Sequence, residues 1–260
     1  MNAISMYVAS ESGLHKLHPL TKGTLTLLLL VAGLALPGKW TAYFLLLFII
    51  MPLAAWGRIF RNHIQTVWAI SWPFALSVVL IQTLFWGEGT PIFELWGIAP
   101  KWEGAQFAFI GVGKIAFVMA DFILFVKTTR PDSLMISLKQ IGFPGSIAYV
   151  VVSTLQIIPN FQRKALTILD AQRSRGLETE GHILTRAQAV VPLVLPLVLG
   201  SLVDVEERAI AIEARAFNSN RKESSLIEIE DSPGQTSLRK LLMLLLVCIL
   251  LARIAWQLLN

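Results

Sequence analysis

The sequence predicts an all-α, polytopic membrane protein with about five transmembrane helices and a helical cytoplasmic region. Three observations lead to this fold class. First, 55% of the 260 residues are hydrophobic and only 15% are charged, a composition too apolar for an ordinary soluble domain. Second, five apolar runs alternate with polar or turn-forming segments. Third, Lys and Arg gather in alternate segments, as they do in the cytoplasmic loops of membrane proteins.

The first two apolar runs are short. Residues 24–36 end at a Pro-Gly-Lys turn, and 40–56 follow, interrupted by Pro52. Because a span needs about 20 residues, both lie near the lower limit, and the turn predicts a tight outer hairpin. The clearer spans are three: 67–85, 107–126 and 241–259. Most of the eight Trp residues fall near span ends, as interfacial aromatic residues do.

The distribution of positive charge predicts the orientation. With the N-terminus inside, the inner segments hold 18 Lys and Arg and the outer ones hold two, Lys39 and Lys101. We therefore expect an inner N-terminus, an outer C-terminus and no cleavable signal peptide. The domains are then a four-span bundle, a cytoplasmic or interfacial region and a last span: 1–127, 128–237 and 238–260. The net charge of +5 is spread between apolar spans, which favours a membrane over nucleic acid as partner.

The region 128–237 contains two apolar runs, 146–158 and 189–203. Their lengths favour buried or interfacial helices, although entry of both into the bilayer stays possible and would add two spans. Pro192 and Pro196 should kink the second run.

A short amphipathic helix ending in an arginine follows each of these runs. The arginines stand between small residues, Ser174-Arg175-Gly176 and Ala214-Arg215-Ala216. Small neighbours let a partner come close to the backbone, and a planar guanidinium offers a rigid set of donors to carboxylates or carbonyls. Gly176 suits the left-handed residue that often ends a helix. The pair indicates a two-pronged contact with a two-lobed partner; the alternative is two ordinary solvated arginines.

This order of motifs resembles the T component (EcfT/CbiQ-like) of energy-coupling factor (ECF) transporters, a membrane scaffold with paired Ala-Arg-Gly motifs. Ser174 and Ala216 depart from that pattern, but both are small. The matching segments run through most of the chain: 15–22, 127–131, 142–144, 157–159, 171–176 and 213–217.

The resemblance implies the function and the partners. A T component joins two cytosolic ABC ATPases to a separate substrate-binding membrane protein, the S component, in the cell membrane of a prokaryote. It would serve uptake of a vitamin, a vitamin precursor or a transition-metal ion. The chain would be no enzyme and would bind no cofactor, with ATP and Mg on the ATPases. The implied ATPase-binding residues are Arg175, Arg215, Ser174, Gly176, Ala214 and Ala216.

Other candidate sites are weaker. Gly111-Val-Gly113-Lys114 lacks the residues of a phosphate loop. His15 and His18 have the spacing of two metal ligands on a helix, but no obvious third ligand accompanies them, so no metal site is expected. We expect Lys114 to reach outward and Asp121 to bond polar groups near the inner interface; a functional pair within the membrane is the alternative. A self-contained secondary permease and a structural membrane anchor remain the rival functions.

Overall fold

A computed structural model of the chain describes residues 7–8, 10, 12–36, 38–86, 89–91, 100–177, 182–215 and 229–259. Within these ranges the secondary structure is helical, apart from an isolated bridge between Pro91 and Lys101. The all-α fold class is therefore confirmed. The chain divides into two compact units, Met1–Ile141 with Ile229–Asn260, and Gly142–Glu228. The first unit is called the membrane bundle below. The functional division at 127/128 and 237/238 stays a prediction.

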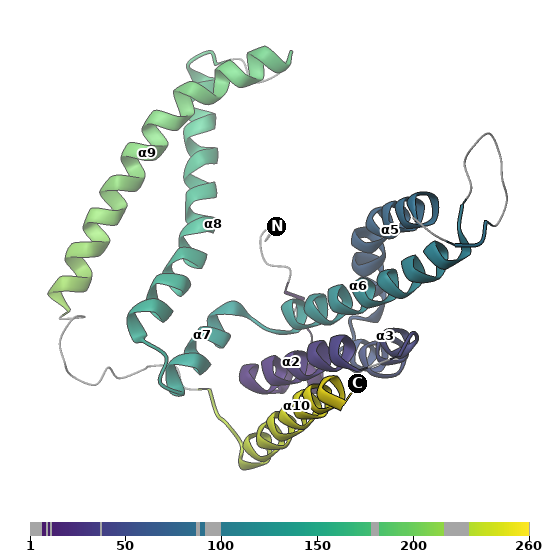
Figure 1. Ribbon diagram of the computed structural model, residues 1–260. Helices are drawn as coiled ribbons and strands as arrows, with labels where there is room; N and C mark the ends of the chain where they lie inside the picture. The colour runs from purple at the N-terminus through teal and green to yellow at the C-terminus, as the bar shows by residue number, and fades with distance from the viewer. Residues whose placement is uncertain are drawn as a thin grey trace. The chain divides into compact units, whose positions relative to one another are not determined.

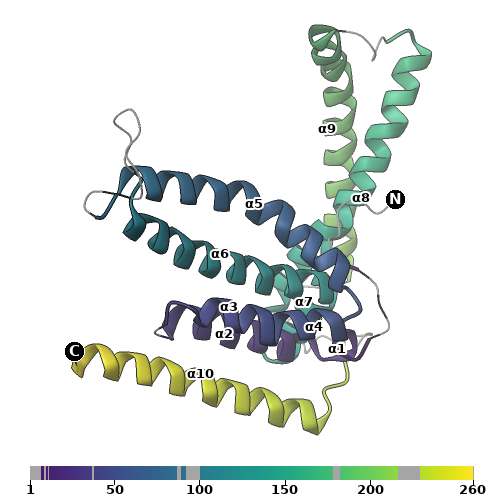
Figure 2. The ribbon, with the colours of Figure 1, turned by 90° about the vertical axis from the view of Figure 1, so that its right-hand side faces the viewer.

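The membrane bundle contains the predicted apolar helices, and Figures 1 and 2 show them side by side. Three helices are long and apolar enough to cross a membrane, and two apolar stretches are shorter, Pro19–Ala35 and Thr41–Trp56. The elements are α1 (Gly13–Lys16), α2 (Pro19–Ala35), α3 (Thr41–Leu45), the π-helix η1 (Leu46–Ile50), α4 (Met51–Trp56), α5 (Phe60–Phe85), α6 (Trp102–Thr128), α7 (Pro131–Gln140) and α10 (Pro233–Leu259).

These helices begin earlier than the apolar runs, because their first turns are polar. Helix α2 begins at Pro19 rather than residue 24, with proline in the first helical position, where its missing N–H costs nothing. The preceding His18 caps it, since its Nδ1 accepts from the Leu20 N–H at 3.3 Å. Helix α5 begins at Phe60 rather than residue 67. The apolar runs therefore located the spans but not their polar ends.

Pro52 does not break the second span. Helical structure is continuous from Thr41 to Trp56, with a π-helical segment, Leu46–Ile50, just before the proline. Proline cannot donate to the helical ladder, and a wider π turn is one way to accommodate a local irregularity. The predicted interruption is thus a change of helix type rather than a gap.

The core of the bundle lies where α2, α6 and η1 meet. Phe117 and Ile50 are fully buried there, and Ala120 packs with them. Gly33 of α2 lies directly against the Phe117 ring, so a side chain at this position would overlap it. Gly113, part of the fragment that mimics a phosphate loop, lies in the same way against the Tyr43 ring. Its role in the fold is therefore close packing of helices.

Two buried lysines tie the ends of the bundle helices together. Lys22 Nζ donates to the His15 carbonyl at 3.1 Å and to the Thr128 carbonyl at 2.7 Å. Lys127 Nζ donates to the Asn62 carbonyl at 2.9 Å and also to the Asn62 and Thr66 side chains. These bonds join the segment before α2 to the end of α6, and α6 to the start of α5.

The second unit contains two long helices, α8 (Gly145–Ser174) and α9 (Ile183–Ala214). Each predicted apolar run and the arginine helix after it form one continuous helix, which corrects the expectation of separate short helices. Helix α9 continues through Pro192 and Pro196. The three helices counted above as long and apolar enough to cross a membrane do not include α8 or α9. We call α8 and α9 the helix pair.

Candidate coupling site

Arg175 stands at the C-terminal end of α8, where the backbone leaves the helix. Gly176 adopts a left-handed conformation (φ 90°), as predicted. The Gly176 N–H donates to the Arg173 carbonyl at 2.9 Å, and the Leu177 N–H donates to the Gln172 carbonyl at 3.0 Å. This bonding is a Schellman motif, which satisfies the last carbonyls of a helix and stops it sharply. It places Arg175 on the last turn, with an exposed side chain.

The small residue before Arg175 leaves its surroundings open. The Ser174 hydroxyl donates to the Asp170 carbonyl at 3.0 Å, so it lies against its own helix. No atom lies near the position that a side chain on Gly176 would occupy. Within the described residues, the space beside Gly176 is therefore open to a partner surface.

Arg215 occupies the corresponding position on α9. The helix ends at Ala214, and Arg215 has nearly the same backbone angles (φ −87°, ψ 9°) as Arg175 (φ −91°, ψ 7°). Both Ala214 and Arg215 are exposed. Ala216, the last of the predicted binding residues, lies outside the described residues. Within the described part of the chain, the two arginines are thus the equivalent cap residues of two helices.

The two helices run in opposite directions, so the two arginines lie at opposite ends of the helix pair (Figure 1). Lys164 of α8 forms an ion pair with Asp204 of α9, and the Gln172 side chain donates to the Pro192 carbonyl at 3.4 Å. As the residue number rises on α8, its partner's number falls on α9. At 1.5 Å of rise per residue, Arg175 and Arg215 are separated by about 33 Å along the helices.

The end of a helix is an electrostatically suitable place for each arginine. The partial negative charge at a helix C-terminus favours a cation there. In the described ranges neither arginine forms an ion pair with a carboxylate, whereas nearby Arg173 approaches Asp170 of its own helix at 3.8 Å. The site therefore presents two exposed guanidinium groups, each at the end of a separate helix.

Among the described residues of the bundle, the polar groups do not form a second site of this kind. Asp121 is buried, and neither carboxylate oxygen has a hydrogen-bond partner among the described residues. The expectation that it bonds polar groups near the interface is therefore wrong, because the neighbouring α6 side chains Phe117, Ala120 and Leu124 belong to the apolar core. In the described ranges no three His, Cys, Asp or Glu side chains cluster as metal ligands would.

Sequence reasoning missed the ion pair between Lys164 and Asp204. A signal was present, because these two residues are 40 positions apart, like Arg175 and Arg215. Only the antiparallel pairing of the helices brings them into contact. The buried lysines Lys22 and Lys127 were also missed as connectors, since their partners are mostly backbone carbonyls and carry no sequence signature.

The apolar helices of the bundle and the exposed helix pair define a polytopic helical membrane protein. Residues 10–226 match the family described as cobalt transport protein (CbiQ). The chain belongs to this family, and the resemblance to T components is confirmed.

Similar proteins carry the name energy-coupling factor transporter transmembrane protein EcfT. The protein from Lacticaseibacillus paracasei is 30% identical over 234 residues, covering 82% of this chain and 84% of the relative. That from Leuconostoc gelidum is 29% identical over 230 residues, covering 82% and 83%. The one from Clostridium kluyveri is 26% identical over 264 residues and covers 97% of both chains.

Proposed function

We propose that this chain is the membrane scaffold and coupling subunit of an ECF-type ABC importer. It would join two cytosolic ABC ATPases to one S component and transmit ATP-driven motion to it. The cargo would be a vitamin, a vitamin precursor or a transition-metal ion. The chain itself would catalyse no reaction, and ATP and Mg would bind to the ATPases. The names of the relatives support this assignment.

One observation carries the proposal: two exposed arginines end the two antiparallel helices, about 33 Å apart along the pair. A dimeric ATPase offers two equivalent grooves, and two such arginines could occupy one groove each. A guanidinium held in a groove would form bidentate bonds with carboxylates that are partly removed from water. Loss of one partner from such a pair costs about 2–5 kcal/mol.

The exposed apolar side chains of the helix pair support a second contact. Val191 is 71% exposed, Leu195 66% and Val150 58%, values too high for side chains that belong to a core. Large apolar patches of this kind mark surfaces that meet a membrane or another protein. In the proposed complex this surface contacts the S component, so that opening and closing of the ATPases moves the helix pair against it.

The positive-inside distribution orients the proposed complex. The segments with most Lys and Arg, including 128–237, would face the cytoplasm together with the N-terminus. The arginines would then lie on the side where the ATPases and ATP are.

Arginine variants test this function. Arg175→Ala or Arg215→Ala alone should lower ATP-dependent uptake by reconstituted complexes more than about tenfold, with part of the ATPase retained. The double variant should release the ATPases. Lys substitutions should give uptake and ATPase retention between those of wild type and of the Ala variants, because lysine keeps the charge but loses the planar set of donors. We expect Arg215 to be the more sensitive position.

The matched control is Arg173→Ala, which removes a neighbouring arginine that approaches Asp170 of its own helix. It should leave uptake and ATPase retention close to wild type. Near-normal transport by the double Ala variant would refute the coupling function. Uptake by the chain reconstituted alone would instead support a permease, and ATPase binding without any transport would support a structural anchor.

A further inference from the structure

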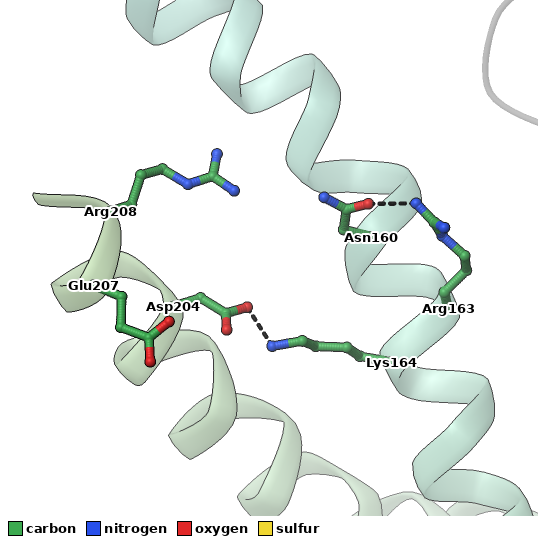
Figure 3. A pocket seen from close by; sticks show the side chains of 6 residues that line it. All are labelled: Asn160, Arg163, Lys164, Asp204, Glu207 and Arg208. Atoms are coloured by element: carbon green, nitrogen blue, oxygen red, sulfur yellow. Dashed lines mark hydrogen bonds and ion pairs between the residues drawn. The ribbon is translucent and has the colours of Figure 1, made fainter. Parts of the chain in front are cut away.

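A charged cluster lies between α8 and α9, in the C-terminal half of each helix (Figure 3). Its side chains line an open hollow of about 600 Å³. In Figure 3 Lys164 reaches across to Asp204, while Arg163 bonds Asn160 of its own helix. The members of the cluster are Asn160, Arg163, Lys164, Asp204, Glu207 and Arg208.

The ion pair in this cluster occupies equivalent positions on the two helices. Lys164 precedes Arg175 by eleven residues, and Asp204 precedes Arg215 by the same number. Because the helices are antiparallel, the two arginines lie at equal distances from the pair, in opposite directions. Each distance is about 16 Å of helix rise. The pair therefore marks the midpoint between the two proposed ATPase contacts.

The charges around the pair favour one register of the two helices. A shift of α9 by one turn, four residues, in one direction would bring Arg208 opposite Lys164, and the two cations would repel each other. A shift by one turn in the other direction would bring Gly200 there, which offers no partner. Either shift would displace one arginine relative to the other by about 6 Å.

The modest burial of the pair is consistent with this role. The Lys164 and Asp204 side chains are 42% and 46% exposed, and ion pairs with this exposure add little to stability. Among the described residues of the second unit, however, this is the ion pair that joins the two helices. Lys164 meets Asp204 in the observed register, and a shift of four residues in either direction loses this contact, so the pair can bias the register of the two helices.

We infer that Lys164 and Asp204 are positioning residues that set the register of α8 against α9, and with it the separation of Arg175 and Arg215. The inference rests on the proposed coupling function. The pair lies away from the arginines, so it would act on ATPase docking only through the geometry of the helix pair.

Distance measurement on the full chain tests the register directly. Spin labels at Ala171→Cys and Ala211→Cys, in a Cys248→Ala background, report the separation of two exposed positions on the outer parts of the helices. Their axial separation is about 21 Å in the observed register. Lys164→Gln should broaden the distribution, with a two- to fivefold larger population displaced by about 6 Å. Each charge reversal alone, Lys164→Asp or Asp204→Lys, should increase the displaced population further.

The exchange variant Lys164→Asp/Asp204→Lys should restore both the distance distribution and ATP-dependent uptake. Arg163→Gln is the matched control, because it removes an adjacent charge that bonds within its own helix. The inference is refuted if Lys164→Gln gives the same distribution as Arg163→Gln, or if the exchange variant resembles the single variants. If Arg175→Ala/Arg215→Ala keeps the ATPases while the register results hold, the proposed function fails instead.

Discussion

The membrane bundle contains a buried apolar core, whereas the described residues of the helix pair contain almost no buried side chain. Leu29, Ile50, Phe117 and Leu124 form one buried cluster in the bundle. In the helix pair, Ala148 is the sole buried side chain among those described. We therefore expect the bundle to be the more stable unit and the helix pair to depend on its proposed partners. Substitutions should accordingly affect stability in the first and assembly in the second.

The largest expected difference concerns glycine. Gly33→Leu places a side chain onto the Phe117 ring in the bundle core, and overpacking of this kind costs about 1–3 kcal/mol or more. At Gly200, on α9, an added Cβ meets no atom within 4 Å, and leucine favours the helix by roughly 0.5–1 kcal/mol over glycine. Thermal unfolding in detergent should show a lower transition temperature than wild type for Gly33→Leu. The transition temperature of Gly200→Leu should not be lowered. Equal destabilisation would contradict the comparison.

A smaller effect is expected at the end of α8. Gly176 has φ 90°, and a residue with a side chain in the left-handed region costs about 1–2 kcal/mol. Gly176→Leu should therefore loosen the last turn, lower ATPase retention and leave the unfolding of the bundle unchanged. Gly176→Asn is the matched control, because Asn tolerates this conformation better. Full retention by the Leu variant would show that the local backbone does not matter for docking.

The smallest effect is a pH dependence at the start of α2. Burial lowers the pKa of His18 below its usual 6.5, with Asp231 opposing this shift and Arg239 adding to it. The fold therefore holds a neutral ring, whose Nδ1 caps Leu20, and its stabilisation is present above pH 6.5. It is lost as the pH falls through the lowered pKa. The His18 backbone N–H also donates to the Gln235 side-chain oxygen of α10 at 2.6 Å, so acidification should loosen this joint.

Hydrogen exchange measures this effect. Amides of residues 18–24 should lose protection between pH 7.5 and 5.5, after correction for the intrinsic rate. In His18→Asn, which keeps a cap but does not titrate, protection should be independent of pH. A pH dependence that persists in His18→Asn would assign the effect to another group. His15, whose pKa is also lowered by burial, would be the next candidate.

The sequence by itself determined the features that depend on local chemistry. Five apolar runs located the spans because burying apolar side chains in lipid requires no specific partner. Gly176 predicted the left-handed end of α8 because that conformation depends on one residue's own backbone. The membership of the chain in its family followed from motifs that are contiguous in sequence.

Only the tertiary structure decided the features that depend on residues far apart in the chain. Apolar runs and arginine segments join into continuous helices because no strong local stop separates them, even at Pro192 and Pro196. The antiparallel pairing of α8 and α9 places Arg175 and Arg215 at opposite ends and brings Lys164 to Asp204. Such contacts arise from packing between helices that are distant in sequence, which composition and spacing alone do not specify.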